Sequence, residues 1–129
     1  MQKVLLIDRD GVINIDIGYL HKIEDCTFIN GVFKACQYFN SLGYQIVIVT
    51  NQSGISRGYF SEKDFQVLTN WMIDQFKRNN IKILDVFHCP HSPESSCDCR
   101  KPNPGMLISA KNKYDIDMDK SWMIGDSER

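Results

Sequence analysis

The chain has 129 residues, and its 15 lysines and arginines nearly balance its 16 aspartates and glutamates, giving a formal net charge of −1. This balance excludes a strongly basic nucleic-acid-binding surface, and no run of about 18 apolar residues is present that could span a membrane. The length predicts a single domain over residues 1–129, with a core large enough to fold without disulfides.

The first part of the chain predicts a strand, a helix and a second strand. Residues 4–7 form a short apolar run typical of a strand buried on both faces. This run is too short for the core of a signal peptide, so we expect a cytoplasmic protein. Residues 30–43 carry apolar side chains at helical spacing and end in glycine, which predicts a helix. The β-branched run at residues 45–50 predicts the second strand, and a loop rich in glycine and serine follows.

The second part predicts two further helices, each followed by a strand. Residues 61–76 begin with a weak capping box and continue with apolar residues three and four positions apart, which predicts a helix. Residues 83–87 predict a third strand, Asn103-Pro104 predicts the start of another helix, and residues 122–124 predict a fourth strand. We expect both tryptophans in the core: Trp71 and Trp122.

This alternation of strands and helices predicts an α/β fold, a Rossmann-like, mostly parallel sheet with helices on both faces. Ligands of such sheets bind outside the carboxyl ends of the strands. Residues that end or closely follow a predicted strand are therefore expected at one rim: Asp8, Thr50, Cys89 and Asp126.

Two carboxylates follow the first predicted strand. Asp8 and Asp10 are two residues apart, so both side chains can face one ligand. Close carboxylates repel each other unless a cation intervenes. Mg²⁺ prefers such oxygen ligands, and Asp126 offers a third. Taken alone, however, an acidic pair after a strand is more often a pair of solvated turn residues.

Groups that could bind phosphate lie in two other segments. Hydroxyl and amide groups that can hold phosphate oxygens follow the second strand: Thr50, Asn51, Gln52 and Ser53. Lys101, next to Arg100, offers a cation for the same oxygens. Thr50 could instead cap its own turn, and Lys101 could be a solvated surface lysine.

Four potential metal ligands lie within eleven residues: Cys89, His91, Cys97 and Cys99. Three thiolates and one imidazole are the tetrahedral donor set that zinc prefers, and a site with four protein ligands is a closed, structural one. Such a site would order the loop of residues 89–99 and position Arg100 and Lys101. The alternatives are a metal-free thiol cluster or a disulfide. We expect His88 to be a packed histidine and not a fifth ligand.

Four ordered motifs resemble those of haloacid-dehalogenase-type phosphatases: Asp8-Arg9-Asp10-Gly11-Val12, Thr50-Asn51, Lys101-Pro102 and Gly125-Asp126. The chain is most similar to the D-glycero-D-manno-heptose 1,7-bisphosphate phosphatase branch, in Gly18-Tyr19-Leu20-His21, in residues 50–58 and in residues 97–107. The related histidinol-phosphate phosphatases share the cysteine segment and the first motif. The length of the cysteine loop matches theirs, so histidinol phosphate remains an alternative substrate.

The resemblance implies a Mg²⁺-dependent phosphomonoesterase that removes the C7 phosphate of a heptose bisphosphate, in the synthesis of lipopolysaccharide precursors. Asp8 would form an aspartyl-phosphate, and Asp10 would act as acid and then as base. Magnesium would be held by Asp8, the backbone carbonyl of Asp10, and Asp126. Thr50, Asn51 and Lys101 would bind the transferring phosphoryl group.

The resemblance further implies a set of substrate contacts: Asp16, Gly18, Tyr19, Gln52, Ser53, Arg57 and Arg100. Tyr19 could instead be a packing residue, and Arg57 a surface charge. The family continues past its Gly-Asp motif, so we expect a fold that is truncated at the C-terminus, with a monomer for the full-length protein. The alternative of another class is an inactive, zinc-stabilised module that only binds phosphate.

Overall fold

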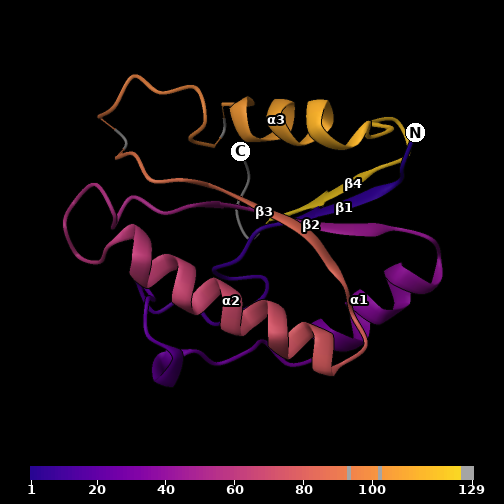
Figure 1. The fold of residues 1–129 in the computed structure, drawn as a ribbon, viewed down its shortest axis with the longest axis horizontal. Helices are drawn as coiled ribbons and strands as arrows, with labels where there is room; N and C mark the ends of the chain where they lie inside the picture. Colours follow the sequence, from indigo (N-terminus) through magenta and orange to yellow (C-terminus); the bar gives the residue numbers. More distant parts are fainter. Residues whose placement is uncertain (93, 102, 126–129) are drawn as a thin grey trace.

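A four-stranded parallel sheet forms the centre of the computed structural model, which describes residues 1–92, 94–101 and 103–125 (Figure 1). The strands are β1 (Val4–Ile7), β2 (Gln45–Asn51), β3 (Ile83–Cys89) and β4 (Trp122–Ile124), in the order β3-β2-β1-β4. The prediction of a parallel α/β sheet is therefore confirmed. With β1 and β2 in the middle, their carboxyl ends lie side by side at one rim.

The two central strands are buried because their apolar side chains alternate between two hydrophobic clusters. Leu5, Ile7, Ile46 and Ile48 belong to the cluster on one face, and Val4, Leu6, Val47 and Val49 belong to the cluster on the other. This two-sided burial explains why both strands are continuous apolar runs in the sequence.

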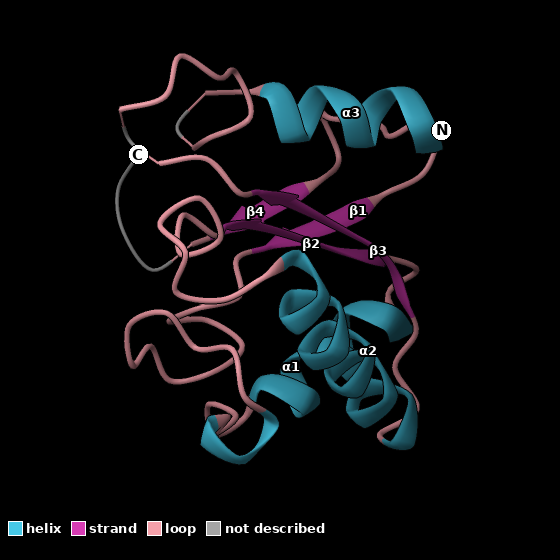
Figure 2. Ribbon diagram, turned by 60° about the vertical axis from the view of Figure 1, so that its left-hand side comes forward, coloured by secondary structure: helices cyan, strands magenta, loops and turns pink. Residues whose placement is uncertain are grey.

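Helices cover both faces of the sheet, as predicted (Figure 2). α1 (Val32–Ser41) and α2 (Glu62–Arg78) lie on one face, and α3 (Gly105–Tyr114) lies on the other. A short 3₁₀ helix spans Ile23–Asp25. Within the described part of the chain, none of the helices combines the length and the hydropathy needed to cross a membrane.

The start of α2 matches the sequence expectation in detail. The Ser61 hydroxyl accepts a hydrogen bond from the Asp64 backbone N–H, and the Asp64 carboxylate accepts one from the Ser61 N–H. These contacts satisfy two backbone donors that a helix start leaves free. From this start, α2 buries Phe65, Leu68 and Met72 against the sheet.

The prediction of a buried Trp122 is wrong, because this residue is 61% exposed. Among the described residues β4 is a short strand at the sheet edge and pairs with β1 alone, and Met123 and Ile124 are also exposed. Trp71 is half-buried, stacks on Phe28 with 5.7 Å between ring centroids, and packs against the core. The apolar residues 122–124 thus correctly predicted a strand that joins the sheet, but not that its side chains are exposed.

Candidate active site

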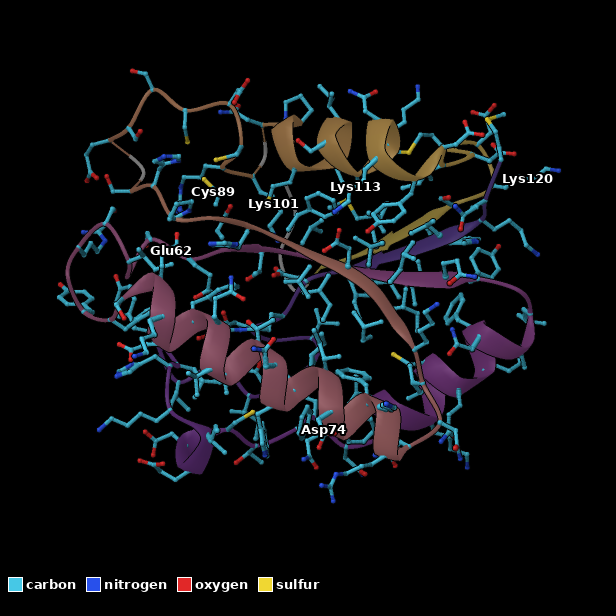
Figure 3. All side chains as sticks on the ribbon, in the orientation of Figure 1. Glu62, Asp74, Cys89, Lys101, Lys113 and Lys120 are labelled. Carbon is cyan, nitrogen blue, oxygen red and sulfur yellow. The ribbon has the colours of Figure 1, made fainter. Side chains whose placement is uncertain are left out.

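A cavity of about 330 Å³ opens where β1 and β2 end. Its lining residues come from the segments that follow these strands and from the loop before α3: Asp8, Asp10, Asp16, Gly18, Tyr19, Asn51, Gln52, Ser53, Gly54 and Lys101. All of these except Gly54 are candidate site residues in the sequence. Figure 3 shows Lys101 and Cys89 at the same end of the sheet, with Lys120 at the opposite end.

Asp8 and Lys101 form an ion pair in the wall of this cavity. The Lys101 Nζ lies 2.9 Å from the Asp8 Oδ2, and both side chains are 11% exposed. Nζ also donates to the Val49 carbonyl at 3.2 Å. An ion pair so shielded from water interacts more strongly than one at the surface. Lys101 is therefore not a solvated surface lysine.

The Asn51 side chain holds the backbone of Lys101 in place. Its Oδ1 accepts a hydrogen bond from the Lys101 N–H at 2.9 Å, and its Nδ2 donates to the Lys101 carbonyl at 3.4 Å. The last residue of β2 thereby fixes the segment that carries the cation. Asn51 lines the cavity, but its amide is used within the protein.

Three side chains donate hydrogen bonds to the Asp10 carboxylate. Arg9 Nη2 reaches both oxygens, at 3.0 and 3.1 Å, and its Nε reaches Oδ1 at 3.2 Å. Asn14 Nδ2 donates to Oδ1 and Gln52 Nε2 to Oδ2, each at 3.0 Å. Arg9 and Asn14 are absent from the candidates that the sequence suggested. Arg9 stands between the two candidate carboxylates in the sequence, but nothing in the pattern indicated that its side chain is buried against Asp10.

Thr50 is buried beneath the cavity and not part of its lining. Its Oγ1 accepts a hydrogen bond from Gln52 Nε2 at 2.9 Å, and the same nitrogen donates to Asp10. Gln52 therefore links the end of β2 to the segment after β1. Thr50 therefore does not only cap its own turn, because it also binds the Gln52 side chain.

The cavity mouth is formed by a tight turn and an aromatic pair. The Asp16 Oδ1 accepts a hydrogen bond from the Gly18 N–H at 3.0 Å. Tyr19 follows with a left-handed backbone, at φ 55°, a conformation that costs free energy for a non-glycine residue. Its ring contacts Tyr59 edge to face, with 4.7 Å between centroids. A Cβ on Gly54 would clash with the buried Phe60 ring and lie 2.9 Å from Tyr19 Cδ1, so this position requires glycine.

Besides Thr50, three candidate residues are not placed in the cavity lining. Arg57 Nη2 lies 4.0 Å from Glu94 Oε2, and Arg100 is half-buried with an Nη1 that has no partner among the described residues. Asp126 lies outside the described residues. Two residues before it, however, the Ile124 carbonyl accepts a hydrogen bond from the Asp8 N–H at 3.0 Å.

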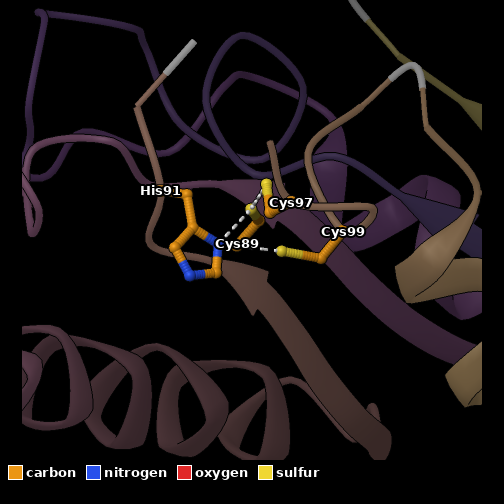
Figure 4. A group of neighbouring side chains, drawn as sticks. All are labelled: Cys89, His91, Cys97 and Cys99. Atoms are coloured by element: carbon orange, nitrogen blue, oxygen red, sulfur yellow. Dashed lines mark hydrogen bonds between the residues drawn. The ribbon is translucent and has the colours of Figure 1, made fainter. Parts of the chain in front are cut away.

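The four cysteine and histidine ligands converge next to this site (Figure 4). The ligand atoms of Cys89, His91, Cys97 and Cys99 all lie within 4.8 Å of one another. Cys89 Sγ lies 3.6 Å from Cys97 Sγ, and His91 Nδ1 lies 3.2 Å from Cys99 Sγ. Tetrahedral zinc with Zn–S bonds of about 2.3 Å separates two sulfurs by roughly 3.7 Å. The cluster therefore has the donors and the spacing of a metal site.

The thiols of this cluster differ in acidity. Burial raises the pKa of Cys97, but hydrogen bonds from the Arg100 N–H and from the Cys89 and Cys99 thiols outweigh it and lower this pKa to about 6. Burial and the two neighbouring thiols raise the pKa of Cys99 to about 12, and burial raises the pKa of Cys89. A metal ion would therefore have to displace protons from Cys89 and Cys99.

The cluster is connected to the cavity through the backbone. The Gln52 N–H donates to the Cys89 carbonyl at 2.7 Å, and the Ser56 N–H donates to the Pro90 carbonyl at 3.2 Å. His88 does not join the cluster, since it pairs with Glu62 and stacks on Phe65. The prediction of a packed His88 is confirmed.

Comparisons with known proteins place the chain among phosphatases. The family model described as polynucleotide kinase 3 phosphatase matches residues 12–128. A D-glycero-alpha-D-manno-heptose-1,7-bisphosphate 7-phosphatase of Campylobacter jejuni is 50% identical over 125 residues, which cover 97% of this chain and 72% of that protein. The corresponding protein of Photorhabdus laumondii is 47% identical over 131 residues, with 96% and 72% covered. A D-glycero-beta-D-manno-heptose-1,7-bisphosphate 7-phosphatase of Salmonella typhi is 46% identical over 129 residues, which cover 95% of this chain and 69% of that protein.

Two solved structures share the fold. D,D-heptose 1,7-bisphosphate phosphatase from B. bronchiseptica, complexed with magnesium and phosphate, superposes with a TM-score of 0.83 at 31% identity and covers 91% of this chain. A structure described as a putative haloacid-dehalogenase-like phosphatase from Mesorhizobium loti gives a TM-score of 0.89 at 31% identity and covers 98% of this chain. The chain spans 66% and 64% of the length of these two structures.

Proposed function

The chain belongs to the haloacid-dehalogenase-type heptose-1,7-bisphosphate 7-phosphatases, and we propose that it hydrolyses the C7 phosphate of D-glycero-D-manno-heptose 1,7-bisphosphate. The observation that carries this proposal is the Asp8–Lys101 ion pair, which shares one cavity wall with Asp10. The names of the relatives supply the substrate. This activity would serve the synthesis of heptose precursors of lipopolysaccharide.

In the first step of the proposed reaction, an Asp8 carboxylate oxygen attacks the phosphorus. The bond between phosphorus and the sugar oxygen breaks, and Asp10 gives its proton to that oxygen. Lys101 Nζ, which is already paired with Asp8, stabilises the phosphoryl oxygens as their charge changes. The product of this step is an aspartyl-phosphate on Asp8 and a free sugar hydroxyl.

In the second step, Asp10 acts as the base. Its carboxylate takes a proton from a water molecule, whose oxygen attacks the phosphorus. The bond between phosphorus and Asp8 breaks, which releases inorganic phosphate and restores the Asp8 carboxylate. A positioned acid–base group of this kind contributes about 10²–10⁴ in rate.

Magnesium fits the donors of this site. The carboxylates of Asp8 and Asp10 line one cavity and are the oxygen ligands that Mg²⁺ prefers. Asp8, the Asp10 carbonyl and Asp126 would hold the ion, and the pairing of Ile7 with Ile124 directs the segment before Asp126 towards Asp8. Bound Mg²⁺ supplies positive charge to the phosphoryl oxygens. The magnesium and phosphate in the B. bronchiseptica structure support this assignment.

Zinc fits the second cluster, because Cys89, His91, Cys97 and Cys99 offer a closed tetrahedral donor set. Its proposed role is structural. The cluster precedes Arg100 and Lys101 directly, so an ordered loop would fix the cation of the active site.

The remaining candidates are proposed as substrate contacts at the cavity mouth and beside it. Asp16, Gly18, Tyr19 and Ser53 line the cavity and would face the sugar. Arg57 and Arg100 lie outside the lining and would meet the second phosphate of the bisphosphate.

The test is phosphate release under controlled Mg²⁺ from a panel that contains both anomers of the heptose bisphosphate and histidinol phosphate. We expect turnover of a heptose bisphosphate that Asp8→Asn abolishes. Preference for histidinol phosphate would contradict the substrate assignment. Phosphate binding without turnover would indicate a binding module and contradict the enzymatic function.

A further inference from the structure

Arg9 is a buried cation next to the proposed acid–base residue. It is 2% exposed, and its hydrogen bonds are made by Nε and Nη2, whereas the buried Nη1 has no partner among the described residues. Nη2 donates to the Leu20 carbonyl at 3.0 Å, the guanidinium carbon lies 5.9 Å from the Phe65 ring centroid, and the remaining contacts go to Asp10. A buried charge is stable only when it is paired. Among the described residues, the ion-pair partner of Arg9 is Asp10.

We propose that Arg9 is a positioning residue, which fixes the Asp10 carboxylate in the orientation needed for proton transfer. This proposal rests on the proposed function, and it assigns a role to a residue that does not line the cavity. A planar guanidinium that donates to both carboxylate oxygens sets the plane of the carboxylate, which a single donor does not.

The surroundings of Arg9 explain how this orientation is maintained. Phe65 belongs to α2 and is itself buried, so the position of the guanidinium depends on the packing of that helix. Asn14, which is also buried, and Gln52 hold the carboxylate from two other directions. Asp10 is thereby fixed relative to α2 and to β2, the strand that ends at the cavity.

The leaving group of the substrate determines how strongly the loss of Arg9 should slow hydrolysis. A sugar alkoxide is a strong base and leaves only when it receives a proton, whereas a nitrophenolate leaves without one. Displacement of the Asp10 carboxylate should therefore slow hydrolysis of the sugar phosphate more than hydrolysis of p-nitrophenyl phosphate. A purely structural role would slow both reactions equally.

The test combines two variants of Arg9 with a double-mutant cycle. Arg9→Met should lower kcat on the heptose bisphosphate by about 10²-fold, with a smaller loss on the aryl phosphate and little change in KM. Arg9→Lys keeps the charge but not the planar guanidinium. Its kcat on the heptose bisphosphate should fall between those of Arg9→Met and the wild type. Arg78→Met is the matched control, because Arg78 is an exposed arginine that pairs with Asp74 on the surface of α2. It should behave like the wild type.

The cycle uses Asp10→Asn, and residues that act as one unit give non-additive losses. Adding Arg9→Met to Asp10→Asn should therefore lower kcat by less than about threefold relative to Asp10→Asn alone. Additive losses, or equal losses on both substrates, would overturn the role of Arg9 while the phosphatase activity stands. An inactive wild-type chain would instead overturn the proposed function.

A crystal structure of Arg9→Met or Arg9→Lys gives a readout independent of turnover, and an unmoved Asp10 carboxylate would also overturn the proposal.

Discussion

At the scale of single residues, the site depends on an ion pair between Asp8 and Lys101, whose side chains are largely buried. The Asp8 carboxylate is compensated by Lys101 Nζ at 2.9 Å, and Asn51 holds the backbone of that lysine. Each of these side chains comes from a different segment of the chain. The pair therefore forms only when β1, β2 and the loop before α3 are in place.

Lys101→Met tests this ion pair. The substitution keeps the length of the side chain but removes the positive charge, so Asp8 and the phosphoryl group lose a stabilising cation. We expect kcat to fall by about 10²–10³, as measured by phosphate release at saturating substrate. Lys120→Met, at the opposite end of the sheet, serves as the control (Figure 3). Unchanged turnover in Lys101→Met would contradict the assigned role.

At the scale of secondary-structure elements, α3 is attached to the edge strand β3 through Asp85. Its Oδ2 accepts hydrogen bonds from the Tyr114 hydroxyl at 2.6 Å and from Lys113 Nζ at 2.9 Å. Burial raises the pKa of Asp85, but these two bonds, the Val86 N–H and the charge of Lys113 together outweigh it, and the net pKa is lowered. The ionised carboxylate is thus the form that stabilises the fold.

The sign of the pH dependence follows from this lowered pKa. The stabilisation is fully present above the unfolded aspartate pKa of about 3.9 and is lost as the pH falls through the folded value. Tyr114→Phe should lower the free energy of unfolding by about 1 kcal/mol at neutral pH. In denaturant titrations this difference should shrink below about pH 4. A difference that stays constant down to pH 2 would contradict the role of the Asp85 carboxylate.

The loop of residues 89–99 is a second element-scale feature, and its order should depend on metal. Purified protein should contain zinc, and Cys97→Ser should lower both the zinc content and the thermal unfolding midpoint. Cys26→Ser is the control, because that thiol lies outside the cluster. Elemental analysis and thermal unfolding measure the two effects. Equal zinc content in Cys97→Ser and wild type would contradict the assigned ligand set.

At the scale of the whole molecule, β4 leaves an apolar edge exposed. Trp122 is 61% exposed and Met123 47% exposed, on a strand that pairs on one side only within residues 1–92, 94–101 and 103–125. Exposed apolar edge strands favour association between copies. We expect concentration-dependent self-association in sedimentation velocity, reduced by Trp122→Lys but not by Tyr38→Lys, a change of an exposed tyrosine on α1. Equal association in both variants would contradict this expectation.

Most of the fold and much of the site could be predicted from the sequence, for a physical reason. Parallel sheets collect functional groups at the carboxyl ends of strands, so Asp8 and Asn51 were predicted from their position after or at the end of a strand, whereas Lys101 was predicted from its charge next to Arg100. Arg9 could not be predicted, because its role depends on burial against Phe65 and Leu20, which are distant in sequence. Trp122 was mispredicted because the apolar pattern of a short strand does not tell a central position from an edge.

The most direct measurement of the central claim is rapid acid quench of the wild-type chain during turnover, followed by mass spectrometry of its peptides. We expect the peptide that contains Asp8 to carry the mass of one phosphoryl group, which disappears once the substrate is exhausted and which Asp8→Asn lacks. Turnover with no phosphorylated peptide, or with the same modification in Asp8→Asn, would contradict the proposal that Asp8 attacks the phosphorus.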